Sequence, residues 1–358
     1  MSLAAIRYPW AEPPAPGTAT EVAPGLLWMR LPLPMQLDHV NCYALDEGDG
    51  WTLVDTGFDT PEARAVWERL LAGPLAGRPV RRLVVTHYHP DHIGLAGWFV
   101  ARGAELVTTR TSWIFARMLV LDVQDRLPPE SLAYWRAAGM PPEMLDEFAR
   151  DRPFNFADRV SALPLGYTRI REGDRITMGG RVWDIRCGDG HAPEHATFWS
   201  RDDDLVLGGD QLLPSISANI GVYPTEPAAD PLAEWLASCT RFMTLAEARH
   251  LVLPGHKMPF TGLPLRLRQM VENHEGALAR LRPHLATPRM AGECMVPIFK
   301  REITGPVYRM ALVEAVAHLN WLMHRGEVAR ETSADGRWLW RMRRPVAAQV
   351  PQDDDSAA

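Results

Sequence analysis

One stretch of six residues constrains the fold of this chain most, because it contains four potential metal ligands: His87, His89, Asp91 and His92. A short apolar segment at residues 82–85 precedes it and predicts a buried strand. Residues 93–100 follow and predict the start of a packed helix. The ligands therefore lie on a turn at the C-terminal end of a strand, which is where α/β proteins place their chemistry.

The spacing and type of these ligands predict a hydrolytic metal site. Side chains alternate along extended backbone, so His87 and His89 project to the same side. Asp91 and His92 follow where the chain bends, so they can face a second centre nearby. Imidazole and carboxylate without thiolate suit zinc, iron or manganese. A polar loop with capping residues is the simpler interpretation, but three histidines and one aspartate in six positions are too dense for it.

Further candidates follow other predicted strands. Asp55, Asp210 and His256 each stand at the end of an apolar strand, and His191 follows another strand after a short loop. His195 lies four residues after His191, and its role is left open by the spacing alone. Six other histidines fit packing or surface positions better: His39, His250, His274, His284, His318 and His324.

Length and composition describe an ordinary soluble protein. With 358 residues the chain can bury a large core, in one large domain or in one with a small second domain. The four cysteines are scattered without a C-x-x-C pair, which argues against a disulfide framework and a zinc ribbon. Residues 1–17 lack a continuous apolar stretch, and no run of ~18 apolar residues occurs. We therefore expect a cytoplasmic protein without a signal peptide or a membrane span.

The order of elements predicts several segments. Residues 1–20 form an N-terminal arm, and 21–262 alternate strands and helices around the candidate ligands. Within them, residues 111–160 hold three short helices, with helix starts at the Pro-Pro pairs 128–129 and 141–142. We interpret them as a helical insertion against the catalytic face; the alternative is a helical layer of the main core.

The C-terminal part has its own pattern. Residues 263–345 predict two helices, over 265–285 and 308–323, and then a short two-stranded wing, the outline of a winged-helix-like module. Residues 346–358 are predicted to be a disordered tail. The segment 266–344 has a net charge of +6, so the remainder carries −12. This asymmetry indicates either an anionic partner at the basic end or simply an Arg-rich surface.

The pattern H-x-H-x-D-H and the four other strand-end motifs, in this order over residues 20–262, closely resemble the metallo-β-lactamase superfamily of metal hydrolases. The resemblance implies an α+β fold, an αβ/βα sandwich with its site on one edge of two facing sheets. It implies that His87, His89 and His191 bind a first metal, that Asp91, His92 and His256 bind a second, and that Asp210 bridges both. It also implies that Asp55 supports the site without binding metal and that His195 is a neighbour of the ligands.

The implied cofactors are two zinc ions, with iron or manganese as alternatives. The implied reaction is attack on an ester, thioester or lactone carbonyl by a metal-bridging hydroxide, which Asp91 also orients as a catalytic residue. The sequence Asp-Gly-His191-Ala-Pro-Glu-His195 departs from the common family form, so the substrate is left open. The C-terminal module resembles the branch that contains glyoxalase II and the lactamase-β-like 2 protein.

Other functions within or beside the superfamily are a metal-dependent ribonuclease or phosphodiesterase, a mono-iron persulfide-dioxygenase-like enzyme, and a nucleic-acid-binding protein with a structural metal. Basic runs interleaved with aromatic residues are missing from the sequence, which disfavours a nucleic-acid partner. A structural metal site would be closed and four-coordinate, which seven shared ligands do not suit. We therefore expect a small acyl substrate, no membrane contact, and a C-terminal module that forms a homodimer contact or a wall of the substrate pocket.

Overall fold

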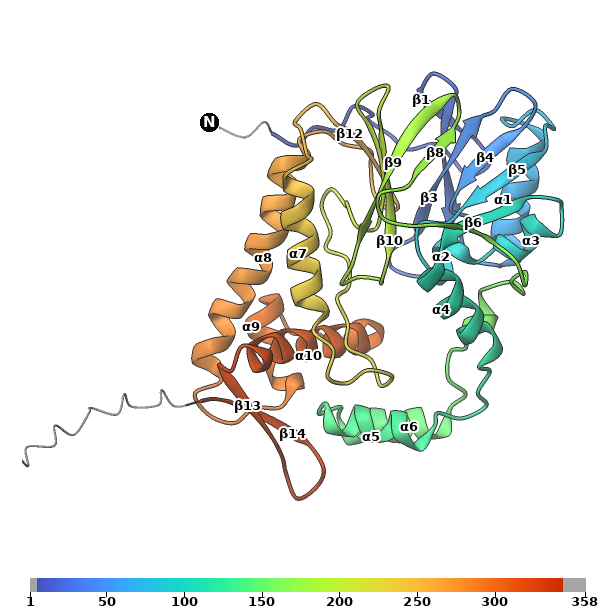
Figure 1. The fold of residues 1–358 in the computed structure, drawn as a ribbon. Helices are drawn as coiled ribbons and strands as arrows, with labels where there is room; N and C mark the ends of the chain where they lie inside the picture. Colours follow the sequence, from blue (N-terminus) through green and yellow to red (C-terminus); the bar gives the residue numbers. More distant parts are fainter. Residues whose placement is uncertain (1–4, 344–358) are drawn as a thin grey trace, which may run out of the picture.

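Two β-sheets lie face to face between outer helices in the computed structural model, which describes residues 5–343 (Figure 1). The first sheet has seven strands in sequence order: β1 (Thr20–Ala23), β2 (Leu26–Pro32), β3 (His39–Asp46), β4 (Trp51–Val54), β5 (Val80–Val84), β6 (Glu105–Thr109) and β7 (Thr168–Ile170). The second sheet, in the order β12-β11-β10-β9-β8, has five: β8 (Arg175–Met178), β9 (Arg181–Gly188), β10 (His195–Ser200), β11 (Leu205–Gly209) and β12 (Leu251–Pro254). The predicted αβ/βα sandwich is confirmed.

The direction of the strands decides where their ends meet. Strands β1 to β4 pair antiparallel, as expected from the strand–turn–strand spacing, and β4 to β7 pair parallel. In the second sheet, β11 and β12 form the parallel pair. The carboxyl ends of parallel strands lie at one edge of a sheet, so residues that follow β4, β5, β11 and β12 are brought to the sheet edges.

Alternating apolar side chains fill the space between the sheets. Trp183 and Ile185 of β9 point to the same side and are fully buried, in a cluster that also contains Trp28 of β2 and Phe198 of β10. This cluster holds the two sheets together, so it fixes the position of their edges relative to each other. Within residues 5–343, no helix combines the length and the apolar character needed to cross a lipid bilayer.

Short helices cover the outer face of the first sheet. Helix α1 (Pro61–Ala72) begins with Pro at its first position, and the Thr60 side chain accepts a hydrogen bond from the Ala63 amide. The helix predicted to begin near residue 93 is split into α2 (Pro90–Ile93) and α3 (Ala96–Val100). The Leu95 amide donates to the Thr56 hydroxyl at 3.0 Å, which takes one donor that a continuous helix would use.

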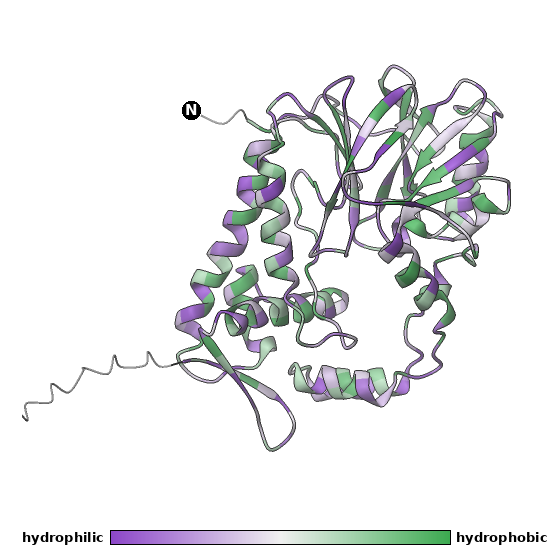
Figure 2. Ribbon diagram, in the orientation of Figure 1, coloured by the Kyte–Doolittle hydropathy of each residue, from purple (hydrophilic) through white to green (hydrophobic). Residues whose placement is uncertain are grey.

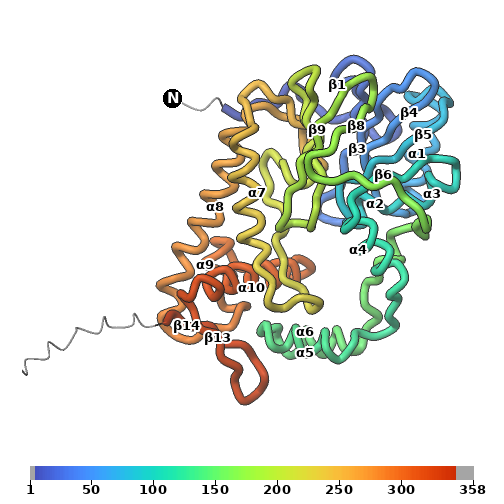
Figure 3. Tube along the Cα trace, viewed as in Figure 1, coloured from blue at the N-terminus to red at the C-terminus, as the bar shows by residue number. Residues whose placement is uncertain are grey.

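The segment after β6 runs away from the sheets and returns to β7, as Figure 3 traces. It contains the three predicted helices, α4 (Arg110–Leu121), α5 (Pro129–Ala137) and α6 (Pro142–Arg150), and the short 3-10 helix η1 (Phe156–Asp158). Helix α4 lies beside the metal-ligand turn, whereas α5 and α6 lie beside the C-terminal part of the chain (Figure 1). Tyr134 and Met140 are buried there, in the large C-terminal core.

Helices also cover the second sheet and continue into the C-terminal part. They are α7 (Pro231–Met243), α8 (Leu263–His284), α9 (Met295–Phe299) and α10 (Tyr308–His324), with 3-10 turns η2 (Ala291–Cys294) and η3 (Gly305–Val307) between them. A hairpin of β13 (Val328–Thr332) and β14 (Trp338–Met342) follows. The two predicted helices and the two-stranded hairpin are thus confirmed, and the description as a winged helix stays a prediction. The predicted tail 346–358 lies outside the described residues.

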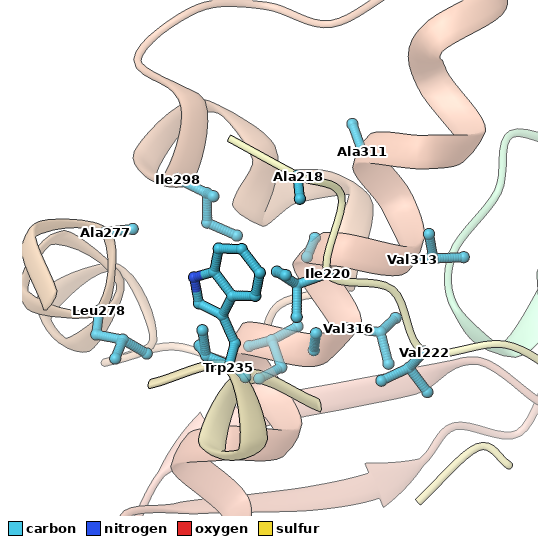
Figure 4. Packing of buried hydrophobic residues seen from close by; sticks show 14 of the residues in the cluster. Ala218, Ile220, Val222, Trp235, Ala277, Leu278, Ile298, Ala311, Val313 and Val316 are labelled. Carbon is cyan, nitrogen blue, oxygen red and sulfur yellow. The ribbon is translucent and has the colours of Figure 1, made fainter. Parts of the chain in front are cut away.

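One apolar core joins the second sheet to the C-terminal helices. Helices α7 and α8 carry bands of hydrophilic and hydrophobic residues (Figure 2), as amphipathic helices do. The indole of Trp235 on α7 lies next to the side chains of Ile220 and Ile298, in the same apolar cluster (Figure 4). Five apolar residues that recur at helical spacing along α10 are all buried: Leu312, Val313, Val316, Leu319 and Leu322. The C-terminal part therefore shares a continuous core with the second sheet.

Candidate metal centre

The predicted ligands come together where strands of both sheets end. Asp55 follows β4 and the turn 86–92 follows β5, while Asp210 and His256 follow β11 and β12. His191 stands on the loop between β9 and β10. Five segments that are far apart in sequence thus supply one cluster of imidazole and carboxylate groups, at the edge that the parallel strand pairs predict.

Three imidazole nitrogens form a first group. The Nδ1 atom of His89 lies 3.0 Å from Nε2 of His87 and 3.0 Å from Nε2 of His191. Three ring nitrogens directed at one another cannot all be satisfied by shared protons when the rings are neutral. They can all be satisfied by a single cation that accepts a lone pair from each. This is the ligand arrangement expected of a first metal position.

A second group contains two imidazoles and a carboxylate. The Oδ2 atom of Asp91 lies 3.3 Å from Nε2 of His256 and 3.7 Å from Nε2 of His92. His92 and His256 are almost fully buried, and the Asp91 side chain retains some exposure. Each of the two groups could hold a metal ion, and a third combination of His87, His92 and Asp210 overlaps both groups.

Asp210 stands between the two groups. Its Oδ2 atom lies 3.6 Å from Nε2 of His191 in the first group and 3.3 Å from Nε2 of His256 in the second. Its Oδ1 atom lies 3.4 Å from Nε2 of His92. No other carboxylate among residues 5–343 is within 4.0 Å of imidazoles from both groups.

Hydrogen bonds to backbone carbonyls on the outer side fix the orientation of two rings, those of His191 and His256. The Nδ1 atom of His191 bonds the Asn219 carbonyl oxygen at 2.9 Å, and that of His256 bonds the His39 carbonyl oxygen at 2.8 Å. A carbonyl can only accept, so Nδ1 carries a proton in both rings, and Nε2 is the atom of each ring that is left to bind a metal. Asn219 and His39 were not predicted, since a backbone carbonyl acceptor leaves no mark in the sequence.

Asp55 lies behind the two groups, in the supporting position that the family resemblance implies. Its Oδ2 atom accepts from the Thr86 hydroxyl and from Nδ1 of His92, both at 2.8 Å, and Oδ1 accepts from the Thr86 amide at 2.8 Å. The Thr86 hydroxyl also lies 3.0 Å from Nδ1 of His87. One buried carboxylate therefore orients a ring in each group, directly for His92 and through Thr86 for His87.

His195 contacts the ligands through its ring and its Nε2 atom, while its buried Nδ1 atom has no hydrogen-bond partner among the described residues. Its Nε2 atom accepts a hydrogen bond from the Asp210 amide at 3.0 Å, and its ring stacks on that of His87 with centroids 4.4 Å apart. Burial lowers the pKa of His195 to about 3, so the ring is neutral and can accept that bond. The structure thus places it as the neighbour that the resemblance implies.

The electrostatics of the cluster favour a cation. Burial lowers the pKa of His87 and of His89 well below the ordinary value, and neighbouring imidazoles add to the effect. Burial also opposes charge on His256, yet the carboxylates of Asp210 and Asp91 raise its pKa to about 10. His87 and His89 are therefore neutral, as metal ligands require, and the carboxylates draw positive charge toward the second group.

Two orphaned atoms test whether the residues fit a metal. Nε2 of His92 and Oδ1 of Asp210 are buried and have no hydrogen-bond partner among the described residues. Each such atom costs about 1–3 kcal/mol if nothing binds it. A divalent cation with nitrogen and oxygen ligands would satisfy both atoms, so the donor set fits the metal that the sequence pattern predicts.

An apolar wall adjoins the centre on the side of the insertion. The Tyr88 ring stacks on Phe115 of α4, with centroids 5.2 Å apart, and on Phe156 of η1 at 6.3 Å. Three apolar side chains of α4 are largely exposed: Ile114, Met118 and Leu121. The helix that directly follows β6 therefore offers apolar surface close to the ligand turn.

Comparison with known proteins agrees with this geometry. The profile described as "Metallo-beta-lactamase superfamily" matches residues 35–256, and the one described as "Metallo-beta-lactamase-like, C-terminal domain" matches 278–343. A "Probable metallo-hydrolase YqjP" from Bacillus subtilis is 27% identical over 302 residues, which span 82% of this chain and 91% of that protein. A ribonuclease Z from Pseudomonas putida is 25% identical over 209 residues, 51% of this chain and 59% of that protein.

A solved structure gives the same result for the fold. The crystal structure of a beta-lactamase domain protein from Burkholderia ambifaria is 36% identical, with a TM-score of 0.86, and the match covers 94% of this chain and 98% of that one. The fold, the two ligand groups and the matched profile, which covers more than half of the sequence, all lead to one conclusion: this chain belongs to the metallo-β-lactamase superfamily.

Proposed function

We propose that the protein is a binuclear metal-dependent hydrolase that acts on an ester, thioester or lactone carbonyl. In this proposal His87, His89 and His191 hold one zinc ion, and Asp91, His92 and His256 hold the other. Asp210 serves both. The position of Asp210 carries the proposal, because its Oδ2 atom lies within 3.6 Å of an imidazole nitrogen from each group.

Two metal ions held there would supply a water with its pKa lowered to roughly 7 and would polarise the carbonyl of the substrate. The protein's own residues do the rest. Asp91 has the most exposed carboxylate of the cluster, and despite its burial the neighbouring His92 and His256 lower its pKa to about 2. It therefore stays ionised and can accept a hydrogen bond from an attacking water. Asp55 and His195 support the ligands and bind no metal.

The apolar part of the substrate is proposed to lie along α4. Tyr88 lies on the ligand turn, and its ring stacks on Phe115 of α4. Together with the exposed apolar side chains of that helix, these two rings form an apolar surface beside the centre. Apolar surface that borders a polar centre is typical of a substrate-binding site. This supports an acyl group as the part of the substrate that the protein recognises.

Metal content and a substrate panel test the proposal together. The purified full chain is loaded with zinc, iron or manganese, counted by mass spectrometry, and assayed on matched esters, thioesters, lactones and a bis-aryl phosphodiester. Two zinc ions per chain and cleavage of carbonyl substrates are expected. A single iron with oxygen consumption would support the persulfide-dioxygenase-like alternative. Turnover of the phosphodiester alone would exclude carbonyl hydrolysis.

A ribonuclease or phosphodiesterase is the second candidate, since the Pseudomonas putida ribonuclease Z is among the relatives and residues 266–344 have a net charge of +6. Contacts to phosphates make binding depend steeply on salt, with a log–log slope of about −0.7 to −0.9 per contact. Labelled RNA and DNA are therefore titrated against the full chain at two salt concentrations. Weak binding with a shallow slope is expected, and micromolar binding with a steep slope would favour the nuclease.

The four cysteines support a reducing compartment. Cys42, Cys187, Cys239 and Cys294 are all free and buried. We therefore also propose a cytoplasmic location, where thiols stay reduced.

A further inference from the structure

We propose that His274, Glu314 and His318 form a separate binding site for one divalent transition-metal cation, outside the candidate catalytic centre. His274 is on α8, and the other two residues are on α10. One ligand atom from each of the three lies within 4.8 Å of the others. In the sequence these histidines fit packing positions, and only the packing of α8 on α10 brings them together.

The two rings face each other with defined nitrogens. Nδ1 of His318 bonds the Glu314 carbonyl oxygen one helical turn earlier, at 2.8 Å, so this nitrogen carries the proton. Nε2 of His318 therefore presents a lone pair, and Nδ1 of His274 lies 3.2 Å from it. Glu314 is four residues before His318, so its carboxylate is on the same face of α10.

The separation of the nitrogens is suitable for a shared cation. Two nitrogens at ~2.0–2.1 Å from one tetrahedral zinc ion are roughly 3.3 Å apart. The 3.2 Å between Nδ1 of His274 and Nε2 of His318 is close to this value. It is also similar to the 3.0 Å separations between the imidazole nitrogens of the first catalytic group.

Burial and charge also point to a cation. Burial lowers the pKa of His274 to about 3 and that of His318 to about 4, so both rings are in the neutral form that binds metal. Burial raises the pKa of Glu314 to about 8. Its carboxylate accepts a hydrogen bond from the Asn219 amide at 3.0 Å, and no Lys or Arg of the described residues forms an ion pair with it. With this pKa the carboxyl group is protonated near pH 7, so a cation bound there would displace its proton.

A hydrogen bond between the two rings is the competing explanation. It accounts for the 3.2 Å contact, but it gives no role to the Glu314 carboxyl group, which has an oxygen within 4.8 Å of both ring nitrogens. Two imidazoles and a carboxylate without thiolate select zinc first, with cobalt and nickel as further ions that such a site accepts. Three protein ligands on two helices would tie α8 to α10.

The metal content of variants of the full chain tests the site. The wild type, His274→Gln and Glu314→Gln are equilibrated with the same buffered zinc concentration, and zinc per chain is counted. Glu314→Gln keeps the shape and the Asn219 hydrogen bond but removes the charge. The matched control is His324→Gln, which changes an exposed histidine on α10 that bonds the Ala228 carbonyl oxygen. We expect His274→Gln to lose one equivalent, Glu314→Gln to bind that equivalent at least tenfold more weakly, and the control to lose none.

A second background keeps the result independent of the catalytic centre. The Asp210→Asn substitution weakens the binding of ions at the catalytic centre. The one zinc ion that His274→Gln removes must still bind in this variant. Cobalt loading gives a further readout, since the visible absorption of one cobalt ion must disappear with His274→Gln in this background. Circular dichroism checks that each variant is folded. If His274→Gln unfolds, the zinc bound by Glu314→Gln decides whether the proposed site exists. If the wild type, His274→Gln and Glu314→Gln bind the same amount of zinc per chain, the two rings form only a hydrogen-bonded pair, and the proposal is wrong.

Discussion

At the scale of single residues, Asp210 is the carboxylate whose oxygens lie close to imidazoles of both groups. We expect Asp210→Ala to lose metal at both catalytic positions. Hydrolysis should fall by more than the roughly 10–100-fold that loss of an outer hydrogen-bond partner costs. Metal stoichiometry of the folded variant measures this, with Asp49→Ala as the control, since Asp49 forms only an exposed ion pair with Arg81. Two catalytic ions still bound to Asp210→Ala would contradict the shared role.

The residues of the centre differ in how far sequence could identify them. His87, His89, Asp91 and His92 are close together in sequence, and their spacing alone predicted a metal site. Asp210 and His256 were found because each stands directly after an apolar strand. Asn219 acts through its backbone carbonyl, and the His274–His318 contact joins positions 44 residues apart, so neither has a local signal.

At the scale of elements, helix α10 reaches the catalytic centre through the loop that carries Asn219. The Asn219 amide donates to Glu314 Oε2 and to the Met310 carbonyl oxygen, both at 3.0 Å, while its own carbonyl accepts from His191. We expect Asn219→Ala to loosen the loop and weaken metal binding at the first position by about 10–100-fold. Zinc titration of the apoprotein measures this. Tyr223→Phe is the control, since its hydroxyl makes only a 3.4 Å contact with Asn219; an equal loss in both variants would contradict the role of the Asn219 amide.

Helix α4 is expected to set the preference for acyl length. Each methylene buried against it contributes up to about 0.8 kcal/mol, or roughly fourfold in kcat/KM. Met118→Glu should therefore raise KM for long-chain esters and leave acetyl esters unchanged. The control is Val296→Glu on α9, since Val296 is 51% exposed and Met118 is 45% exposed. Kinetics over a series of chain lengths decide, and indifference of the wild type to chain length would refute the acyl pocket.

Elements were predicted well where a residue marks their beginning or where polar turns separate them. The starts of α5 and α6 have Pro at the first position, and both helices were predicted. Strand β10 was missed, because it begins with His195 and contains polar Thr197, which are buried although their types suggest a loop. Burial of such residues depends on β9 and β11 on either side, which no local pattern reveals.

At the scale of the whole molecule, the C-terminal part is not a separable attachment. Its helices share one buried cluster with Trp235 of α7 and with Ile220 and Val222 near the centre. We expect a chain ending at residue 262 to expose this surface and to lack a cooperative thermal transition. Circular dichroism and calorimetry of the shortened chain, beside the full chain, measure this. A cooperative transition within a few degrees of that of the full chain would contradict a common core.

The contact from α10 through Asn219 to His191 also bears on how such chains can be recombined. A chimera that takes its C-terminal domain from a relative would receive a new helix face opposite the old 219–222 loop. Because that loop orients a metal ligand, the mismatch would reduce metal occupancy even if both parents bind metal well. Productive exchange therefore requires the loop and α10 to be transferred together, and the functional boundary lies before residue 219 rather than at the start of α8.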